Sequence, residues 1–163
     1  LQSDIMVGSG KLNKDITLAR ISSIQGLYEL EICGADDSKT IFDIINHRYD
    51  DNLDPKDTLP DKGMLGILIE GVSANKSELD RIVSLSLDGD KSIQNIDTLL
   101  LIILRAGVYE LTSLNTPKPV VIDEYVKVTK SFYLGKEGGF VNGVLDKIGS
   151  NLPSIKEKFS FSG

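Results

Sequence analysis

Apolar residues recur at spacings of three and four along most of this chain, and no stretch shows a sustained apolar–polar alternation. The clearest case runs from Phe140 through Val141, Val144 and Leu145 to Ile148. This spacing places apolar side chains on one face of an α-helix, whereas a half-buried strand needs alternation. The sequence therefore predicts an all-α fold with no sheet.

The pattern divides the chain into about seven helices. We expect them near residues 13–33, 38–49, 64–72, 75–86, 96–114, 122–132 and 140–148. Asn75 with Glu78 three residues later has the form of a capping box, which would begin the fourth helix. The fifth is apolar nearly all round, which is typical of a central buried helix.

The two ends of the chain carry no such pattern. Residues 1–10 contain two glycines and no periodicity, and we expect a disordered leader or an artificial remnant there. Residues 11–151 are expected to form one folded helical domain, and residues 152–163 a flexible tail.

Cysteine, histidine and apolar segments limit the possible chemistry. Cys33 is the single cysteine and His47 the single histidine, which excludes an internal disulfide and a Cys/His zinc site. The longest apolar run, residues 99–104, ends at Arg105 and is far shorter than the ~20 residues that a bilayer needs. No secretion signal is visible. We expect a cytoplasmic protein with no membrane contact, no catalytic site, no metal and no cofactor.

The net charge of −6 argues at first against a nucleic-acid partner. Acidic residues are concentrated between residues 29 and 62, however, while bases exceed acids in residues 11–28 and 118–158. A polyanion could therefore bind near either end of the chain without meeting the acidic middle. Ordinary scatter of charge on a solvated surface explains the same distribution.

Arg105 interrupts the most apolar helix of the chain. An unpaired buried charge is costly, so this side chain must reach the surface or find a partner. A structural ion pair and a binding surface are both consistent with the sequence.

Three segments together resemble the bacterial transcription antitermination factor family NusB. They are RISSIQGLYE at residues 20–29, ILRAGVYEL at 103–111 and FVNGVLDK at 140–147, and the third is the most specific. The resemblance extends over about residues 12–150. It implies an all-α fold of two helical bundles packed together, in agreement with the periodicity.

What the resemblance implies about function is not catalytic. Members of this family bind the boxA element of nascent transcripts, chiefly ribosomal RNA leaders, jointly with NusE, a small-subunit ribosomal protein. The pair joins other Nus factors on RNA polymerase and suppresses premature termination. Single-stranded RNA of this kind is held by Lys and Arg at its phosphates, and by aromatic and amide side chains at its unstacked bases.

The resemblance also implies the residues that would do this. It places the RNA surface on the first helix and on the turn between the sixth and seventh helices, which the family fold would bring together in one basic track. The residues are Lys11, Lys14, Arg20, Gln25, Tyr28, Lys130, Phe132, Lys136 and Phe140. Phe140 also belongs to the apolar stripe of its helix, so a core position is the alternative. Arg105, Tyr109 and Glu110 are the candidates for binding the protein partner.

The chain departs from the family pattern at its start. Members usually carry a run of arginines into the first helix, whereas residues 15–18 here read Asp-Ile-Thr-Leu. Fewer phosphate contacts predict weaker RNA binding by the chain alone and a shallower dependence on salt. Two alternatives stay open: an RNA-binding module related to ribosomal RNA cytosine methyltransferases, and a protein-only scaffold that has lost RNA binding. The RNA sequence, the affinity and the choice between monomer and homodimer stay open as well.

Overall fold

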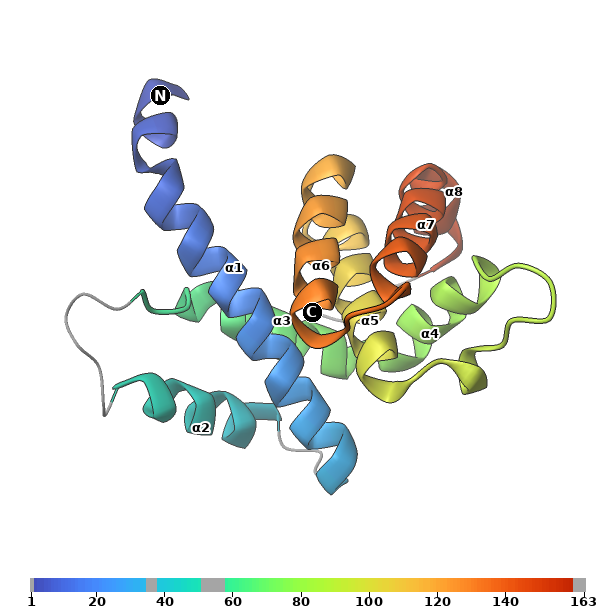
Figure 1. Cartoon of the computed structure of the whole chain (residues 1–163), viewed down its shortest axis with the longest axis horizontal. Coiled ribbons are helices and arrows are strands. Elements are labelled where there is room, and N and C mark those ends of the chain that lie inside the picture. The colour runs from blue at the N-terminus through green and yellow to red at the C-terminus, as the bar shows by residue number, and fades with distance from the viewer. Residues whose placement is uncertain (1, 35–37, 51–57, 160–163) are drawn as a thin grey trace. The chain divides into compact units, whose positions relative to one another are not determined.

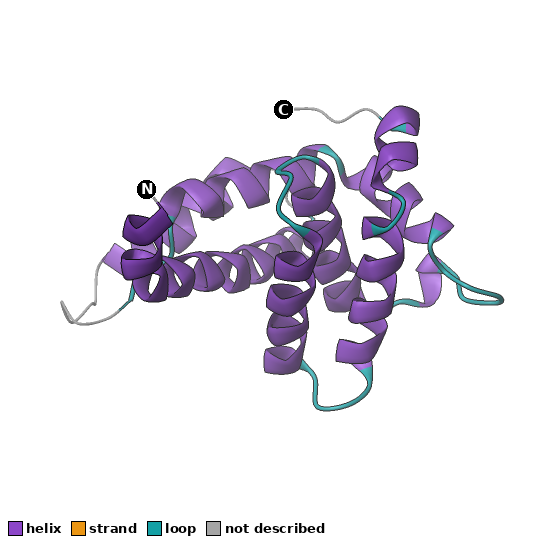
Figure 2. Ribbon diagram, turned by 90° about the horizontal axis from the view of Figure 1, so that it is seen from above, coloured by secondary structure: helices purple, strands orange, loops and turns teal. Residues whose placement is uncertain are grey.

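The computed structural model describes residues 2–34, 38–50 and 58–159 of the chain. In these ranges the structure is helical, with loops and no strand (Figure 2). This confirms the predicted all-α class. The elements in chain order (Figure 1) are α1 (Gln2–Cys33), α2 (Ser38–Asp50), α3 (Lys62–Ala74), α4 (Lys76–Leu85), the 3₁₀ turn η1 (Ile93–Asn95), α5 (Thr98–Thr112), α6 (Lys118–Phe132), α7 (Glu137–Gly149) and α8 (Leu152–Lys158). No described helix is long and apolar enough to cross a membrane.

The chain separates into two compact units, residues 1–70 and residues 71–163, with the division inside α3. In the first unit α1 packs against α2, and Gly26 of α1 faces Ile41 and Ile45 of α2. A Cβ at Gly26 would lie 2.4 Å from Cδ1 of Ile45, so a larger residue there would force a neighbouring side chain to move. The buried apolar side chains of this unit include Ile24, Leu27, Ile41, Ile45, Leu65, Leu68 and Ile69.

The second unit is built around α5, which packs against α4, α6, α7 and α8. From Ile102 to Thr112 every residue of α5 is buried, as expected for a helix that is apolar nearly all round. Gly107 of α5 allows Leu145 of α7 to approach closely, because a Cβ there would lie 2.9 Å from the leucine Cδ2. Tyr125 of α6 is fully buried against this core.

The ends of the chain differ from the predictions. α1 begins at Gln2, so residues 2–10 are helical where we expected a disordered leader. Once a helix is nucleated, each further residue adds one hydrogen bond, and extension does not need an apolar stripe. Residues 152–158 form α8 rather than a flexible tail, and Phe159 directly after it is buried. Residues 160–163 of the expected tail lie outside the described residues.

The expected capping box at the start of α4 is wrong in its details. Asn75 does occupy the N-cap position, but its side chain makes no capping hydrogen bond. Its Nδ2 instead donates to the carbonyl oxygen of Gly71 at 2.8 Å. Asn75 is buried and directly follows the last residue of α3, so its side-chain amide bonds to α3 rather than to α4.

Replacing Gly143 of α7 and Gly107 of α5 by alanine should change the free energy of unfolding in opposite directions. Nothing lies within 4 Å of a Cβ built at Gly143, which is exposed in the middle of α7. We expect Gly143→Ala to raise the free energy of unfolding by about 0.5–1 kcal/mol, because alanine favours the helix. Gly107→Ala should lower it by about 1–3 kcal/mol, since its Cβ meets Leu145 in a packed core. Urea unfolding of both variants measures the two changes, and equal effects would contradict the packing described here.

Candidate nucleic-acid interface

The outward face of α1 carries three of the residues expected to bind RNA. Lys14, Gln25 and Tyr28 are all exposed. At 3.6 residues per turn these positions fall within about 60° of one another around the helix axis. The first unit therefore presents a cation, an amide and an aromatic ring along one line of α1.

Arg20 does not belong to this face. It is only 5% exposed and lies on the inner face of α1, as do Ala19, Ser23 and Ile24. Around the helix axis, Arg20 lies more than about 100° from both Lys14 and Gln25. The face of α1 that exposes Lys14 and Gln25, where the other candidate RNA contacts of α1 lie, therefore does not expose Arg20. The side chain of Lys11 lies outside the described residues.

The turn between α6 and α7 brings together the expected residues of the second unit. Lys130 and Lys136 are exposed, while Phe132 and Phe140 are half-buried. A Cβ built at Gly138 would lie 3.4 Å from Cε of Lys130, so the lysine stem lies beside the first turn of α7. The structure thus places two cations and two aromatic rings at one turn, which is the combination expected for single-stranded RNA.

Tyr133 fixes this turn to the start of α5. Its hydroxyl donates a hydrogen bond to the carboxylate of Asp97, the N-cap residue of α5. Its backbone N–H also bonds the carbonyl of Thr129 at 2.9 Å. Burial and the Asp97 carboxylate together raise the pKa of Tyr133 well above its usual range, so the hydroxyl stays a donor. The turn is held in place by a tertiary contact that sequence periodicity does not reveal.

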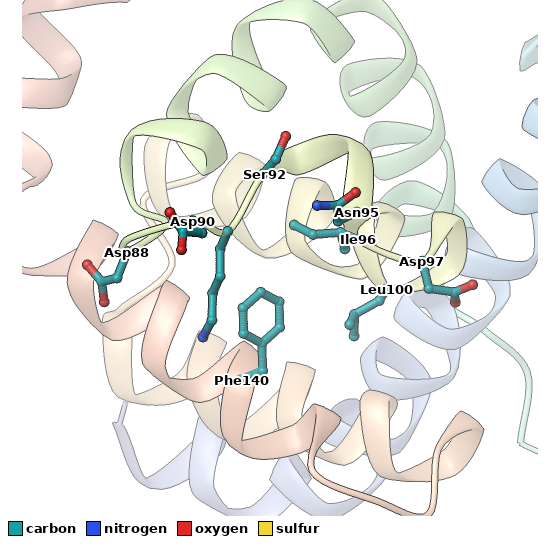
Figure 3. A pocket seen from close by; sticks show the side chains of 9 residues that line it. Asp88, Asp90, Ser92, Asn95, Ile96, Asp97, Leu100 and Phe140 are labelled. Atoms are coloured by element: carbon teal, nitrogen blue, oxygen red, sulfur yellow. The ribbon is translucent and has the colours of Figure 1, made fainter.

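A hollow of about 510 Å³ opens beside Phe140 (Figure 3). The loop between α4 and α5 supplies most of its wall, and Leu100 of α5 and Phe140 of α7 supply the rest. The lining residues are Asp88, Asp90, Lys91, Ser92, Asn95, Ile96, Asp97, Leu100 and Phe140. The ammonium of Lys91 lies 5.3 Å from the centre of the Phe140 ring, a cation–π contact.

Two of the acidic residues of this hollow are already engaged. Asp88 accepts a hydrogen bond from Nζ of Lys147 at 2.7 Å, and that bond and the lysine charge lower the pKa of the carboxyl. Asp97 is bonded to Tyr133, as described above. The hollow was not predicted from the sequence. Gly89, in the loop that forms its wall, adopts the left-handed conformation with φ of 60°.

Arg105 is a structural residue of the second unit. It is 5% exposed, and its Nε and Nη2 donate to the two carboxylate oxygens of Asp80 at 2.6 and 3.0 Å. This decides between the two sequence-based alternatives in favour of an ion pair. The fork-like geometry matches the guanidinium to the carboxylate and joins α5 to α4.

Tyr109 and Glu110 are also internal. Burial raises the pKa of Tyr109, and its ring occupies the space where a Cβ of Gly71 would lie. Glu110 is fully buried and accepts hydrogen bonds from the hydroxyls of Tyr125 and Thr116. Arg105, Tyr109 and Glu110 therefore do not form an exposed partner surface, in contrast to our expectation, because a central helix directs its polar groups inward.

The described residues contain no group of three or more His, Cys, Asp or Glu side chains that could hold a metal ion. Cys33 and His47 are both exposed, on α1 and α2 respectively.

Comparison with known proteins points to one family. Residues 17–150 match the model of the NusB family. The transcription antitermination protein NusB of Caulobacter vibrioides is 33% identical over 142 residues, which are 86% of this chain and 95% of that protein. The corresponding protein of Sphingopyxis alaskensis is 32% identical over 136 residues, which are 82% of this chain and 91% of that protein.

Solved structures agree with the sequence comparison. T. maritima NusB superposes with a TM-score of 0.69 at 26% identity, covering 88% of this chain and 96% of the other. A crystal structure of the antitermination factors NusB and NusE in complex with dsRNA gives a TM-score of 0.65 at 24% identity, with the same coverage. At this level of identity, the second comparison shows a shared fold alone.

Proposed function

This chain belongs to the NusB family, and from that membership we propose that it is a transcription antitermination factor. It binds boxA-like single-stranded RNA together with NusE, a small-subunit ribosomal protein, and supports ribosomal RNA transcription. It does so in the cytoplasm, in a larger complex with other Nus factors and RNA polymerase. Its relatives are named as antitermination proteins rather than as enzymes, which supports a binding role without catalysis.

The observation that carries this proposal is the α6–α7 turn. Exposed Lys130 and Lys136 can neutralise phosphates, and the half-buried rings of Phe132 and Phe140 are the candidates for stacking on unstacked bases. The contact between Tyr133 and Asp97 holds the turn in one geometry before RNA arrives. A preorganised site loses less conformational entropy on binding.

The outer face of α1 makes a second contribution. Lys14, Gln25 and Tyr28 repeat the same chemistry of cation, amide and ring on the first unit. We propose that both surfaces contact the RNA, so that a variant on either unit weakens binding.

Burial of Arg20 strengthens the expectation that the chain alone binds RNA weakly. The family's usual arginine run is missing here, and the one arginine of this part of α1 is turned inward. With few phosphate contacts, the salt dependence is shallow and much of the affinity comes from the complex with NusE. Arg105, Tyr109 and Glu110 serve this partnership only by maintaining the fold of the second unit.

The test is an RNA titration of the chain with and without NusE at several salt concentrations. Lys136→Ala should weaken binding of the complex to all RNAs about equally and lower the slope of log K against log salt by roughly one unit. Lys127→Ala is the matched control, because it removes an exposed lysine whose partner is Asp123 one turn earlier on α6.

The outcomes separate the rival functions. If the complex with NusE forms but binds no RNA at any salt concentration, the chain is a protein-only scaffold. If Lys136→Ala and Lys127→Ala change the slope equally, the α6–α7 turn is not the phosphate contact. Methyl transfer to ribosomal RNA by the chain would favour the methyltransferase-related alternative.

A further inference from the structure

We propose that the hollow beside Phe140 is a pocket for one unstacked RNA base, read at an amino group on its edge by Asp90 and Asn95. This rests on the proposed function and adds to it a position at which the base sequence matters. The wall of the pocket is the loop between α4 and α5, a segment outside the residues expected to contact RNA.

The shape of the hollow suits a flat ring. Its volume of about 510 Å³ is in the range of small-ligand sites. Phe140 stands in the middle, with Asn95, Ile96 and Leu100 on one side and Asp88 and Asp90 on the other (Figure 3). Such sites are typically apolar with a few polar groups that fix orientation, and here Ile96 and Leu100 supply apolar surface next to the ring.

Lys91 occupies the place that a base would take. Its ammonium lies 5.3 Å from the centre of the Phe140 ring and is exposed. Stacking of a base on an aromatic ring is stronger than a cation–π contact at an exposed position, so a base can displace the ammonium. The displaced lysine remains near the RNA backbone and can bind the phosphate of the same nucleotide. Lys91 thus covers the ring in the free protein and holds the backbone in the complex.

Only part of the acidic charge of the hollow is left for a ligand. The hollow has three aspartates, but Asp88 is paired with Lys147 and Asp97 is bonded to Tyr133. Among the other lining residues, Asp90 and Asn95 are exposed and carry acceptor oxygens. A carboxylate or amide oxygen accepts from the amino groups of adenine, cytosine or guanine, which uracil lacks.

The experiment uses the full chain in complex with NusE and a set of boxA-like RNA oligonucleotides. In each oligonucleotide one purine loses only its amino group, by replacement of adenosine with purine riboside or of guanosine with inosine, or one cytidine is replaced by uridine. We expect one position at which this loss weakens binding about tenfold. The double variant Asp90→Ala/Asn95→Ala should bind the RNA with and without this amino group equally well.

Two further variants separate the parts of the pocket. Lys91→Ala should keep the base discrimination while lowering the salt slope by about one unit, because it loses a phosphate contact. Lys127→Ala should retain both the discrimination and the affinity of the unmodified chain, since it lies on α6 outside the lining residues. A fluorescent 2-aminopurine at the sensitive position should be quenched on binding, and less so with Phe140→Leu.

Three results would overturn the inference. In the first, the unmodified complex binds RNA, and the Asp90/Asn95 variant distinguishes the two forms of the base as strongly as the unmodified complex does. The pocket then reads no base, and only this inference fails. If that variant weakens association with NusE in the absence of RNA, the hollow takes a cationic side chain of the partner instead. If the unmodified complex binds no RNA, the proposed function fails and the pocket fails with it.

Discussion

Replacing Asp80 by alanine is expected to lower the free energy of unfolding of this chain by about 3 kcal/mol, as for other buried ion pairs that lose one member. Asp80 accepts two hydrogen bonds from Arg105, whose side chain is only 6% exposed. The variant leaves the guanidinium desolvated inside the second unit without this carboxylate. Urea unfolding followed by circular dichroism measures the loss, which shifts the midpoint without a large change in slope.

The matched control is Asp123→Ala. Asp123 also pairs with a basic residue, Lys127 at 2.9 Å, but both side chains are more than 60% exposed. Such a surface pair contributes about 0–1 kcal/mol. Equal losses of stability in the two variants would show that the burial of Arg105 does not determine how much stability is lost. Replacing Asp80 and Arg105 together by apolar residues of similar size should recover most of the stability, since the buried guanidinium is then removed with its carboxylate.

This prediction also changes what an Arg105 variant reports. From the sequence alone, loss of Arg105 would be expected to impair partner binding more than RNA contact. The structure indicates instead that Arg105→Ala weakens the fold and, with it, both activities. A folded variant that lost only the partner would contradict the structural role.

The fold was predictable from the sequence because helix formation here is a local property. The apolar spacing of residues 140–148 indicates which side of that helix is buried, and the nearly continuous apolar character of residues 96–114 indicates a central helix. Both helices are found. The ends of helices are less well determined, since neither the start of α1 nor the short α8 depends on an apolar stripe. α8 is instead accompanied by tertiary contacts, among them the ring of Phe159, which lies 5.2 Å from the Arg81 guanidinium.

The candidate site was only partly predictable. Lys130, Lys136 and Phe140 lie within a short segment, so their proximity follows from one turn of chain. Burial of Arg20 could have been found by placing it on a helical wheel with Gln25, but the motif that contains both residues suggested a shared role. The contact of Lys91 with Phe140 joins residues far apart in sequence, and no periodicity predicts it.

Replacement of Tyr28 by alanine is the functional change with the largest expected effect. Tyr28 is 38% exposed on the outer face of α1, so its ring is available for stacking. Loss of one base-stacking ring costs about 1–3 kcal/mol, or roughly 5- to 150-fold in affinity. Because no charge is removed, the salt slope should stay unchanged, in contrast to Lys136→Ala. Fluorescence anisotropy of labelled RNA with the NusE complex at two salt concentrations measures both quantities.

Two neighbouring variants show whether stacking is the cause. Tyr28→Phe keeps the ring and should bind nearly as well as the unmodified chain. Ile32→Ala removes an apolar side chain that is 62% exposed one turn further along the same face, and it should have little effect because it cannot stack. If Ile32→Ala weakens binding as much as Tyr28→Ala, the face binds through general apolar contact. If both Tyr28→Ala and Lys136→Ala leave the affinity of the complex unchanged, neither unit provides the proposed RNA contacts, and a protein-only scaffold explains the chain better.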